Sequence, residues 1–177
     1  MNSIVIMGVA GCGKSSLGVA VAKQLQLAIV EGDDHHSSEN LAKMQHGVAL
    51  TDVDRAGWLA ALGTQLRTHP DGMVLTCSAL KRAYRDQLRL AATALRFVFL
   101  DISREHATAR VAARAASHFF SASLMDSQFN TLEVPTGEQG VLRVDALLPL
   151  AQLQAQVCSW LTAIPATTNQ TLQEEKA

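Results

Sequence analysis

Short apolar runs alternate along the chain with stretches in which hydrophobic residues recur every three or four positions. The apolar runs predict five buried strands, at residues 3–7, 27–30, 73–77, 96–100 and 141–144. Strands that alternate with helices favour a parallel sheet covered by helices on both faces. We therefore expect an α/β fold whose ligands bind at the carboxyl ends of the strands.

Helix-period stretches follow the predicted strands. Leu17, Val21 and Leu25 share one face of a helix that begins near Lys14. Thr51 and Asp54 form the pattern of a capping box at the start of another helix, with Asp in place of the usual Glu or Gln. The remaining helices are predicted around residues 39–45, along Leu80, Tyr84 and Leu88, from Ser103 to about Arg114, and from Pro149 to about Leu161.

Residues 115–140 are less periodic than the rest of the chain, and we interpret them as a mobile helical flap, or lid. Pro165 cannot continue the last helix, so the polar residues 165–177 are expected to fray. At roughly 150 residues per domain, the length predicts one domain. We therefore expect a single domain over residues 1–164, followed by a polar tail.

The composition fits one globular domain. Hydrophobic residues make up 48% and charged residues 18%, which excludes disorder over most of the length. A net charge of −1 lacks the basic excess of a nucleic-acid-binding domain, and no apolar run approaches the ~18–20 residues that span a bilayer. Cys12, Cys77 and Cys158 are too scattered for a disulfide framework. We expect the cysteines to be reduced and to pack as small apolar residues, as in a reducing compartment. The protein is therefore expected to be cytoplasmic, with no nucleic-acid or membrane partner.

A glycine-rich segment after the first predicted strand matches the pattern G-x-x-x-x-G-K-[ST]. Its glycines let the backbone curl, so that successive N–H groups and the following helix N-terminus form an anion cradle. Lys14 would bind the β- and γ-phosphates, and the Ser15 hydroxyl would ligate Mg²⁺. The predicted nucleotide-binding residues are Gly8, Val9, Ala10, Gly11, Cys12, Gly13, Lys14, Ser15 and Ser16.

This loop predicts that the sheet is of the P-loop NTPase type. Two motifs that the sequence lacks exclude some classes of P-loop protein. The chain has no N-K-x-D sequence, the guanine-reading motif of GTPases. Its third strand ends in Leu75-Thr76-Cys77-Ser78, without the Walker-B acid of motor and transporter ATPases. A P-loop domain of this length resembles the small-molecule and nucleoside-monophosphate kinases.

Charged residues near other strand ends are candidates for binding the acceptor. Asp33 follows the second strand, where it could accept a proton from a substrate hydroxyl or ligate Mg²⁺ through water; the alternative is an ordinary acidic turn. Lys81, Arg85 and Arg89 lie four apart, either as a pocket for an anionic substrate or as a solvated helix face.

Two further groups have a less specific pattern. Arg110 and Arg114, four apart before the lid, would neutralise charge on a transferring phosphoryl group or lie on the surface. The histidines, among them His36 and His118, lack the spacing of a metal site.

Several blocks of the sequence, in their order, resemble the gluconokinases of the small P-loop type. The resemblance covers roughly residues 3–161. Its blocks are Gly8 to Ser15, Glu31-Gly32-Asp33, Asn40 to Met44 with Gly47, Leu50 to Arg55 with Trp58-Leu59, Cys77 to Lys81, Tyr84-Arg85-Asp86 with Leu88-Arg89, His118 to Phe120, Ser127-Gln128-Phe129 and Leu132-Glu133. The Cys-Ser-Ala-Leu-Lys block is far more specific than the P-loop.

The resemblance implies phosphorylation of D-gluconate to 6-phosphogluconate with ATP and Mg²⁺, often by a homodimer. It implies that Asp33 is the base or hydroxyl acceptor, and that Arg55, Lys81 and Arg85 hold the sugar acid. Arg110 and Arg114 would act from the lid. The chain departs from the family at Asp34-His35, at Leu132 to Pro135, and by one extra residue between Arg114 and His118. A shikimate- or nucleotide-type kinase and a non-catalytic nucleotide-binding regulator remain alternatives.

Overall fold

The computed structural model describes residues 3–92, 94–114 and 122–163. It contains the predicted strands: β1 (Ile4–Met7), β2 (Ala28–Glu31), β3 (Met73–Cys77), β4 (Arg96–Asp101) and β5 (Val141–Asp145). The helices are α1 (Lys14–Leu25), α2 (Ser38–Gln45), α3 (Asp52–Thr68), α4 (Arg82–Ala91), α5 (Arg104–Arg114), α6 (Ala122–Thr131) and α7 (Leu150–Ala163). A 3-10 turn, η1 (Gly32–His35), follows β2.

The strands form one parallel sheet in the order β2-β3-β1-β4-β5, as the alternation of strands and helices predicts. β1 lies in the centre, with Ile4 beside Val74 of β3 and Arg96 of β4. The glycine-rich loop therefore leaves the sheet at the carboxyl end of its central strand. The order reverses direction at β1, which is where open parallel sheets bind ligands.

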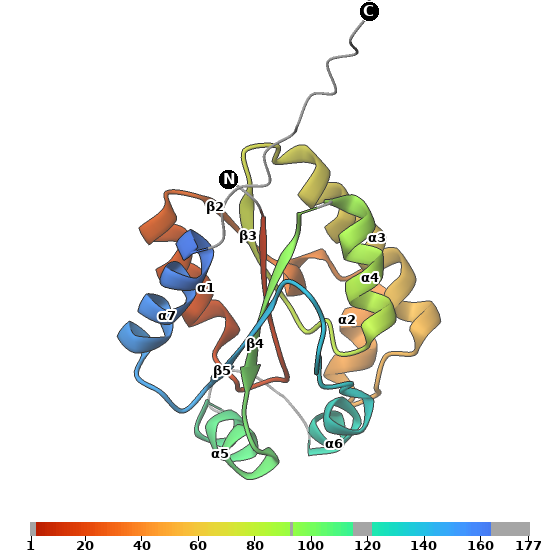
Figure 1. The fold of residues 1–177 in the computed structure, drawn as a ribbon. Coiled ribbons are helices and arrows are strands. Elements are labelled where there is room, and N and C mark those ends of the chain that lie inside the picture. The colour runs from red at the N-terminus through yellow and green to blue at the C-terminus, as the bar shows by residue number, and fades with distance from the viewer. Residues whose placement is uncertain (1–2, 93, 115–121, 164–177) are drawn as a thin grey trace, which may run out of the picture.

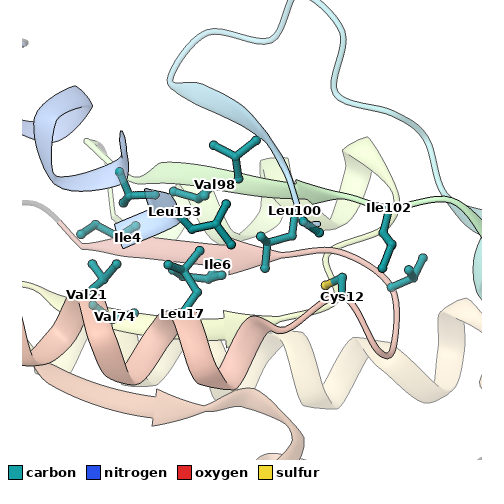
Figure 2. Close-up of a cluster of buried hydrophobic side chains, with 14 of the residues drawn as sticks. Ile4, Ile6, Cys12, Leu17, Val21, Val74, Val98, Leu100, Ile102 and Leu153 are labelled. Atoms are coloured by element: carbon teal, nitrogen blue, oxygen red, sulfur yellow. The ribbon is translucent and has the colours of Figure 1, made fainter. Parts of the chain in front are cut away.

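Helices cover both faces of the sheet, with α1 and α7 on one side and α3 and α4 on the other (Figure 1). Side chains of β1 alternate between the two layers. Ile4 and Ile6 pack in the cluster that includes Leu17 and Leu153 (Figure 2), whereas Val5 and Met7 pack in the opposite cluster. Burial of each of these aliphatic side chains contributes about 1.5–3 kcal/mol to the stability of the fold. The packing on both faces of the sheet therefore stabilises the position of β1 and of the loop that follows it.

Side-chain caps fix where two helices near this edge begin. At the start of α3, the Thr51 hydroxyl accepts a hydrogen bond from Asp54 N at 3.2 Å, and the Asp54 carboxylate accepts one from Thr51 N at 2.9 Å. This reciprocal pair is the predicted capping box. The Ser103 hydroxyl accepts a hydrogen bond from His106 N at 3.3 Å at the start of α5.

The segment predicted as a lid is only partly described. Within it, α6 confirms the helical prediction, but Leu124 and Met125 are buried and Met125 belongs to the core. In this structure α6 therefore packs on the body of the domain through Leu124 and Met125, and the mobility of the segment stays a prediction. Residues 115–121 and the predicted tail lie outside the described residues. Within the described chain, no helix is both long and apolar enough to cross a membrane.

Candidate active site

The glycine-rich loop adopts a conformation that side chains would obstruct. Gly8 and Gly11 have φ angles of +143° and +78°. A Cβ on Gly8 would lie 2.9 Å from the Leu100 carbonyl oxygen, and one on Gly11 would lie 2.7 Å from the Ala107 carbonyl oxygen. Glycine is therefore required both for the backbone curl and for the close approach of β4 and α5.

Lys14, the first residue of α1, carries the positive charge of this loop. Its ammonium group donates hydrogen bonds to the carbonyl oxygens of Gly8 at 3.2 Å and Val9 at 3.1 Å. The side chain thus folds back over the loop, with its charge beside the helix N-terminus. A positive charge next to backbone N–H groups at a helix start is the arrangement that binds a polyphosphate.

Glu31 supplies a carboxylate that the sequence analysis did not assign to any role. It is the last residue of β2 and lies beside Thr76 in the parallel register of β2 and β3. One of its carboxylate oxygens accepts hydrogen bonds from Ser15 Oγ at 3.0 Å and Thr76 Oγ1 at 2.5 Å. A carboxylate therefore lies beside the end of β3, on the neighbouring strand β2.

The Gly32-Asp33 turn places an exposed carboxylate at the same edge. A Cβ on Gly32 would lie 2.3 Å from the Thr76 carbonyl oxygen, so only glycine allows η1 to turn this closely against β3. Trp58 of α3 donates a hydrogen bond from its indole nitrogen to the Gly32 carbonyl at 2.7 Å. Asp33 follows directly and is exposed.

Three of the predicted site residues carry charges that affect the pKa of one buried group, the Cys77 thiol at the end of β3. The pKa of Cys77 is raised to about 12, mainly by burial and to a smaller extent by the negative charge of Asp33, against the lowering effects of a backbone hydrogen bond at Ala79 and of the positive charges of Lys14 and Arg55. Lys14, Asp33 and Arg55 come from three separate segments, and all lie within electrostatic range of this strand end. The segments that carry these three residues start at the carboxyl edge of the sheet: α1 after the phosphate loop, η1 after β2, and α3 beside η1.

Two buried polar atoms in this region have no hydrogen-bond partner in the described structure: Arg55 Nε and His36 Nδ1. The His36 ring stacks on Trp58, with ring centroids 4.5 Å apart. Burial lowers the pKa of His36, Asp33 raises it and Arg55 lowers it, so the imidazole is neutral at pH 7. Buried polar groups usually have partners, so a pair without any marks a place where a polar ligand can be bound.

Lys81, the residue before α4, lies across from a carboxylate that the sequence analysis also missed. Its ammonium group donates to Asp52 Oδ1 at 2.7 Å, and the hydroxyl of the buried Tyr84 donates to the same oxygen at 2.5 Å. Hydrogen bonds from Lys81 and Tyr84 lower the pKa of Asp52. Asp52 is exposed, so this ion pair is a solvated one and can exchange its partners.

The structure places Arg85 in a buried ion pair, which does not favour the predicted role of Arg85 in holding the sugar acid. Its side chain is completely buried and forms an ion pair with Glu138. Its guanidinium also donates to the carbonyl oxygens of Ala79, Leu80 and Glu133. A residue spacing of four cannot distinguish a buried side chain from an exposed one, and no local pattern indicates Glu138. Arg89 of the same predicted stripe also pairs with Glu138, at 2.9 Å.

Of the two predicted lid arginines, Arg110 lies beside the phosphate loop. Its guanidinium donates to the carbonyl oxygen of Cys12 at 3.4 Å and to that of Ala146 at 2.9 Å. Arg114 ends α5, and its side chain lies outside the described residues, as does His118. Among the residues the structure describes, no three His, Cys, Asp or Glu side chains cluster as metal ligands.

A parallel sheet with this phosphate loop after its central strand β1, and with a carboxylate at the end of β2, beyond β3, defines a P-loop kinase. A family model for an AAA domain matches residues 4–135. A gluconokinase from Gluconobacter oxydans (strain 621H) is 44% identical over 144 residues, which cover 80% of each chain.

Two solved structures agree with the sequence relative. A gluconokinase from Sinorhizobium meliloti 1021 is 43% identical, with a TM-score of 0.81, over 92% of this chain and 96% of that one. A sugar kinase from Janibacter sp. HTCC2649 is 38% identical, with a TM-score of 0.86, over 92% of this chain and 95% of that one. The chain belongs to the gluconokinase family.

Proposed function

We propose that this enzyme transfers the γ-phosphoryl group of ATP to the primary hydroxyl of D-gluconate, forming 6-phospho-D-gluconate and ADP. The observation that carries the proposal is that the phosphate loop with Lys14 follows β1 and the turn with Asp33 follows β2, so both lie at the carboxyl edge of one parallel sheet, with Arg55 on the neighbouring α3. This arrangement offers a cation for the phosphates, a carboxylate for the hydroxyl and a second cation for a carboxylate-bearing acceptor. Family membership supports gluconate as that acceptor.

In the reaction, a bond forms between the acceptor oxygen and the γ-phosphorus, and the bond from that phosphorus to the bridging oxygen of ADP breaks. Phosphoryl transfer leaves little covalent work for the protein, so positioning and charge neutralisation dominate. Lys14 and the loop amides stabilise the charge on the phosphoryl oxygens. Asp33 orients the hydroxyl and accepts its proton.

The oxygens of Ser15 and Glu31 fit the Mg²⁺ that accompanies ATP. A hydroxyl and a carboxylate held within 3.0 Å of each other are hard oxygen donors of the kind that Mg²⁺ prefers. Bound there, the ion would neutralise phosphate charge during transfer. Glu31 would hold the metal and its water, and Thr76 would orient the Glu31 carboxylate.

Arg55 and Lys81 are the residues we assign to the sugar acid. Arg55 has a buried N–H without a partner, and its guanidinium lies 5.9 Å from the Tyr84 ring centroid. Lys81 pairs with the exposed Asp52 and lies 5.7 Å from the Tyr84 ring centroid, and a substrate carboxylate can replace the solvated ion pair. Arg110 places a further positive charge beside the loop, and the role of Arg114 in neutralising the phosphoryl group stays a prediction.

An ADP-release assay with gluconate, related aldonates, shikimate and nucleoside monophosphates tests the acceptor. Turnover with gluconate at least tenfold above the others is expected. Turnover with shikimate or a nucleotide but not with gluconate would identify a different kinase. Nucleotide binding without turnover on any acceptor would identify a regulator.

We also propose that the enzyme acts as a homodimer in the cytoplasm. The dimer is supported by the family resemblance and by large apolar side chains on the surface, such as Leu90 of α4, which is 88% exposed. Sedimentation equilibrium tests the dimer, and cell fractionation tests the location.

A further inference from the structure

Gln128 connects α6 to the phosphate loop through one hydrogen bond. Its side-chain carbonyl oxygen accepts a hydrogen bond from the backbone N–H of Ala10 at 2.7 Å, across 118 positions of sequence. Gln128 is half-buried, and Ala10 lies between the two flexible glycines Gly8 and Gly11. The peptide plane at Ala10 is therefore oriented by a side chain from another part of the fold.

The loop is also bounded by β4 and α5, but these contacts act differently. The Leu100 and Ala107 carbonyl oxygens lie so close to Gly8 and Gly11 that they exclude side chains there. Contacts of this kind limit the space that the backbone occupies. The hydrogen bond from Ala10 fixes a direction, because its strength depends on the donor angle.

α6 is itself held firmly, so Gln128 projects from a fixed position. Met125 is buried in the core, and the Arg104 guanidinium lies 5.2 Å from the ring centroid of Phe129. Arg104 also forms an ion pair with Asp126 at 2.6 Å. These contacts attach α6 to α5, and α5 packs against the same loop.

We propose that Gln128 is a positioning residue for the nucleotide: by orienting the Ala10 peptide, it holds the phosphate loop in its binding conformation. This goes beyond the proposed function, because it concerns the nucleotide and is independent of the acceptor. Gln128 acts through the loop backbone.

The Gln128→Met variant tests the proposal, since methionine keeps the unbranched length but has only a weak acceptor. We expect its Kd for ADP and for ATP, measured by calorimetry without any acceptor, to rise about tenfold. The KM for gluconate should stay within about twofold of the parent value. Gln128→Glu retains an oxygen acceptor but adds charge near the phosphates, so its nucleotide affinity should recover as salt is raised. The Gln128→Met defect should be insensitive to salt.

Asn130→Met is the matched control on the same helix. The Asn130 side chain is exposed and contacts Arg104 at 3.3 Å, so its replacement should leave nucleotide affinity within about twofold. Unchanged affinity in Gln128→Met would overturn the proposal, and so would an equal loss in Asn130→Met. Tighter nucleotide binding by Gln128→Met would also overturn the proposal, because it would mean that the hydrogen bond between Ala10 and Gln128 opposes nucleotide binding. Nucleotide binding is measured without gluconate, so a wrong acceptor assignment leaves this test intact.

Discussion

Arg85 and Glu138 form an enclosed ion pair, although 53 positions separate them in the sequence. The Arg85 side chain is 0% exposed and that of Glu138 is 7% exposed. Because Arg85 also binds carbonyl oxygens of Ala79 and Glu133, it attaches the loop after β3 to the segment after α6.

Replacing Arg85 with alanine should therefore destabilise the fold. Removing Arg85 leaves the buried Glu138 with the partly exposed Arg89 as its remaining ion-pair partner. Breaking a buried pair costs about 3–5 kcal/mol in the free energy of unfolding, and the pairing with Arg89 should keep the loss at or below the lower end of that range. Urea unfolding measures this loss. Arg82→Ala is the control, because Arg82 lies on the same helix but is 71% exposed, and its pair with Asp86 should contribute at most about 1 kcal/mol. Arg85→Ala with normal stability and a raised KM for gluconate would restore the substrate role implied by the family resemblance.

The same pair should make the stability depend on pH in acid. Hydrogen bonds from Arg85 lower the pKa of Glu138 from 4.5 to about 2, against the opposing effect of burial. The folded state therefore binds its proton more weakly than the unfolded state does. The stabilisation is complete above pH 4.5 and is lost as the pH falls towards 2. Thermal unfolding from pH 6 to pH 3 should show a steeper loss of Tm in the parent than in Glu138→Gln; parallel curves would exclude this assignment.

The strands and most helices could be predicted because their pattern is local. β3 was predicted at its observed bounds, and the caps at Thr51 and Ser103 follow from residues a few positions apart. The packing of α6 against the body was missed. Whether a helix lies on the core depends on contacts with distant segments, which periodicity does not contain.

The residues of the candidate site also fall into those that a local motif predicts and those that depend on contacts between distant segments. The phosphate loop is a contiguous motif, so Lys14 and Ser15 could be assigned from their spacing. The position of Glu31 next to Ser15 and Thr76 depends on the register between β2 and β3. The burial of Arg85 depends on Glu138, which no nearby residue predicts. A sequence pattern shows which residues share a helix face, but not what covers that face.

Glu31→Gln tests the proposed metal ligand. The amide keeps an oxygen that can accept the hydrogen bonds of Thr76 and Ser15, but it removes the negative charge. The Mg²⁺ concentration for half-maximal activity should rise about 10–100-fold. Asp34→Asn is the control, because Asp34 is an exposed acid of the neighbouring turn, and it should leave this concentration unchanged. An unaltered Mg²⁺ requirement in Glu31→Gln would remove Glu31 from the metal site.

Arg55→Lys tests the acceptor site. Lysine keeps the charge but lacks the planar group of donors, so the KM for gluconate should rise about tenfold or more while the KM for ATP is unchanged. Arg67→Lys is a matched change on the same helix, where the Arg67 guanidinium contacts Thr64, and it should have no effect on either KM. An increase confined to the KM for ATP would place Arg55 at the nucleotide instead.

Lys14→Met tests the phosphate loop itself. The Lys14 ammonium group binds only carbonyl oxygens of its own loop among the contacts seen here, Gly8 and Val9 at 3.2 and 3.1 Å, so its loss should cost little stability. Because Lys14 stabilises charge that develops during transfer, kcat should fall about 10²–10³-fold. Lys23→Met removes an exposed lysine from the last turn of α1, and its kcat should match the parent. A Lys14→Met enzyme with near-normal kcat and normal Tm would mean that phosphoryl charge is neutralised elsewhere, with Arg110 beside Cys12 as the next residue to replace.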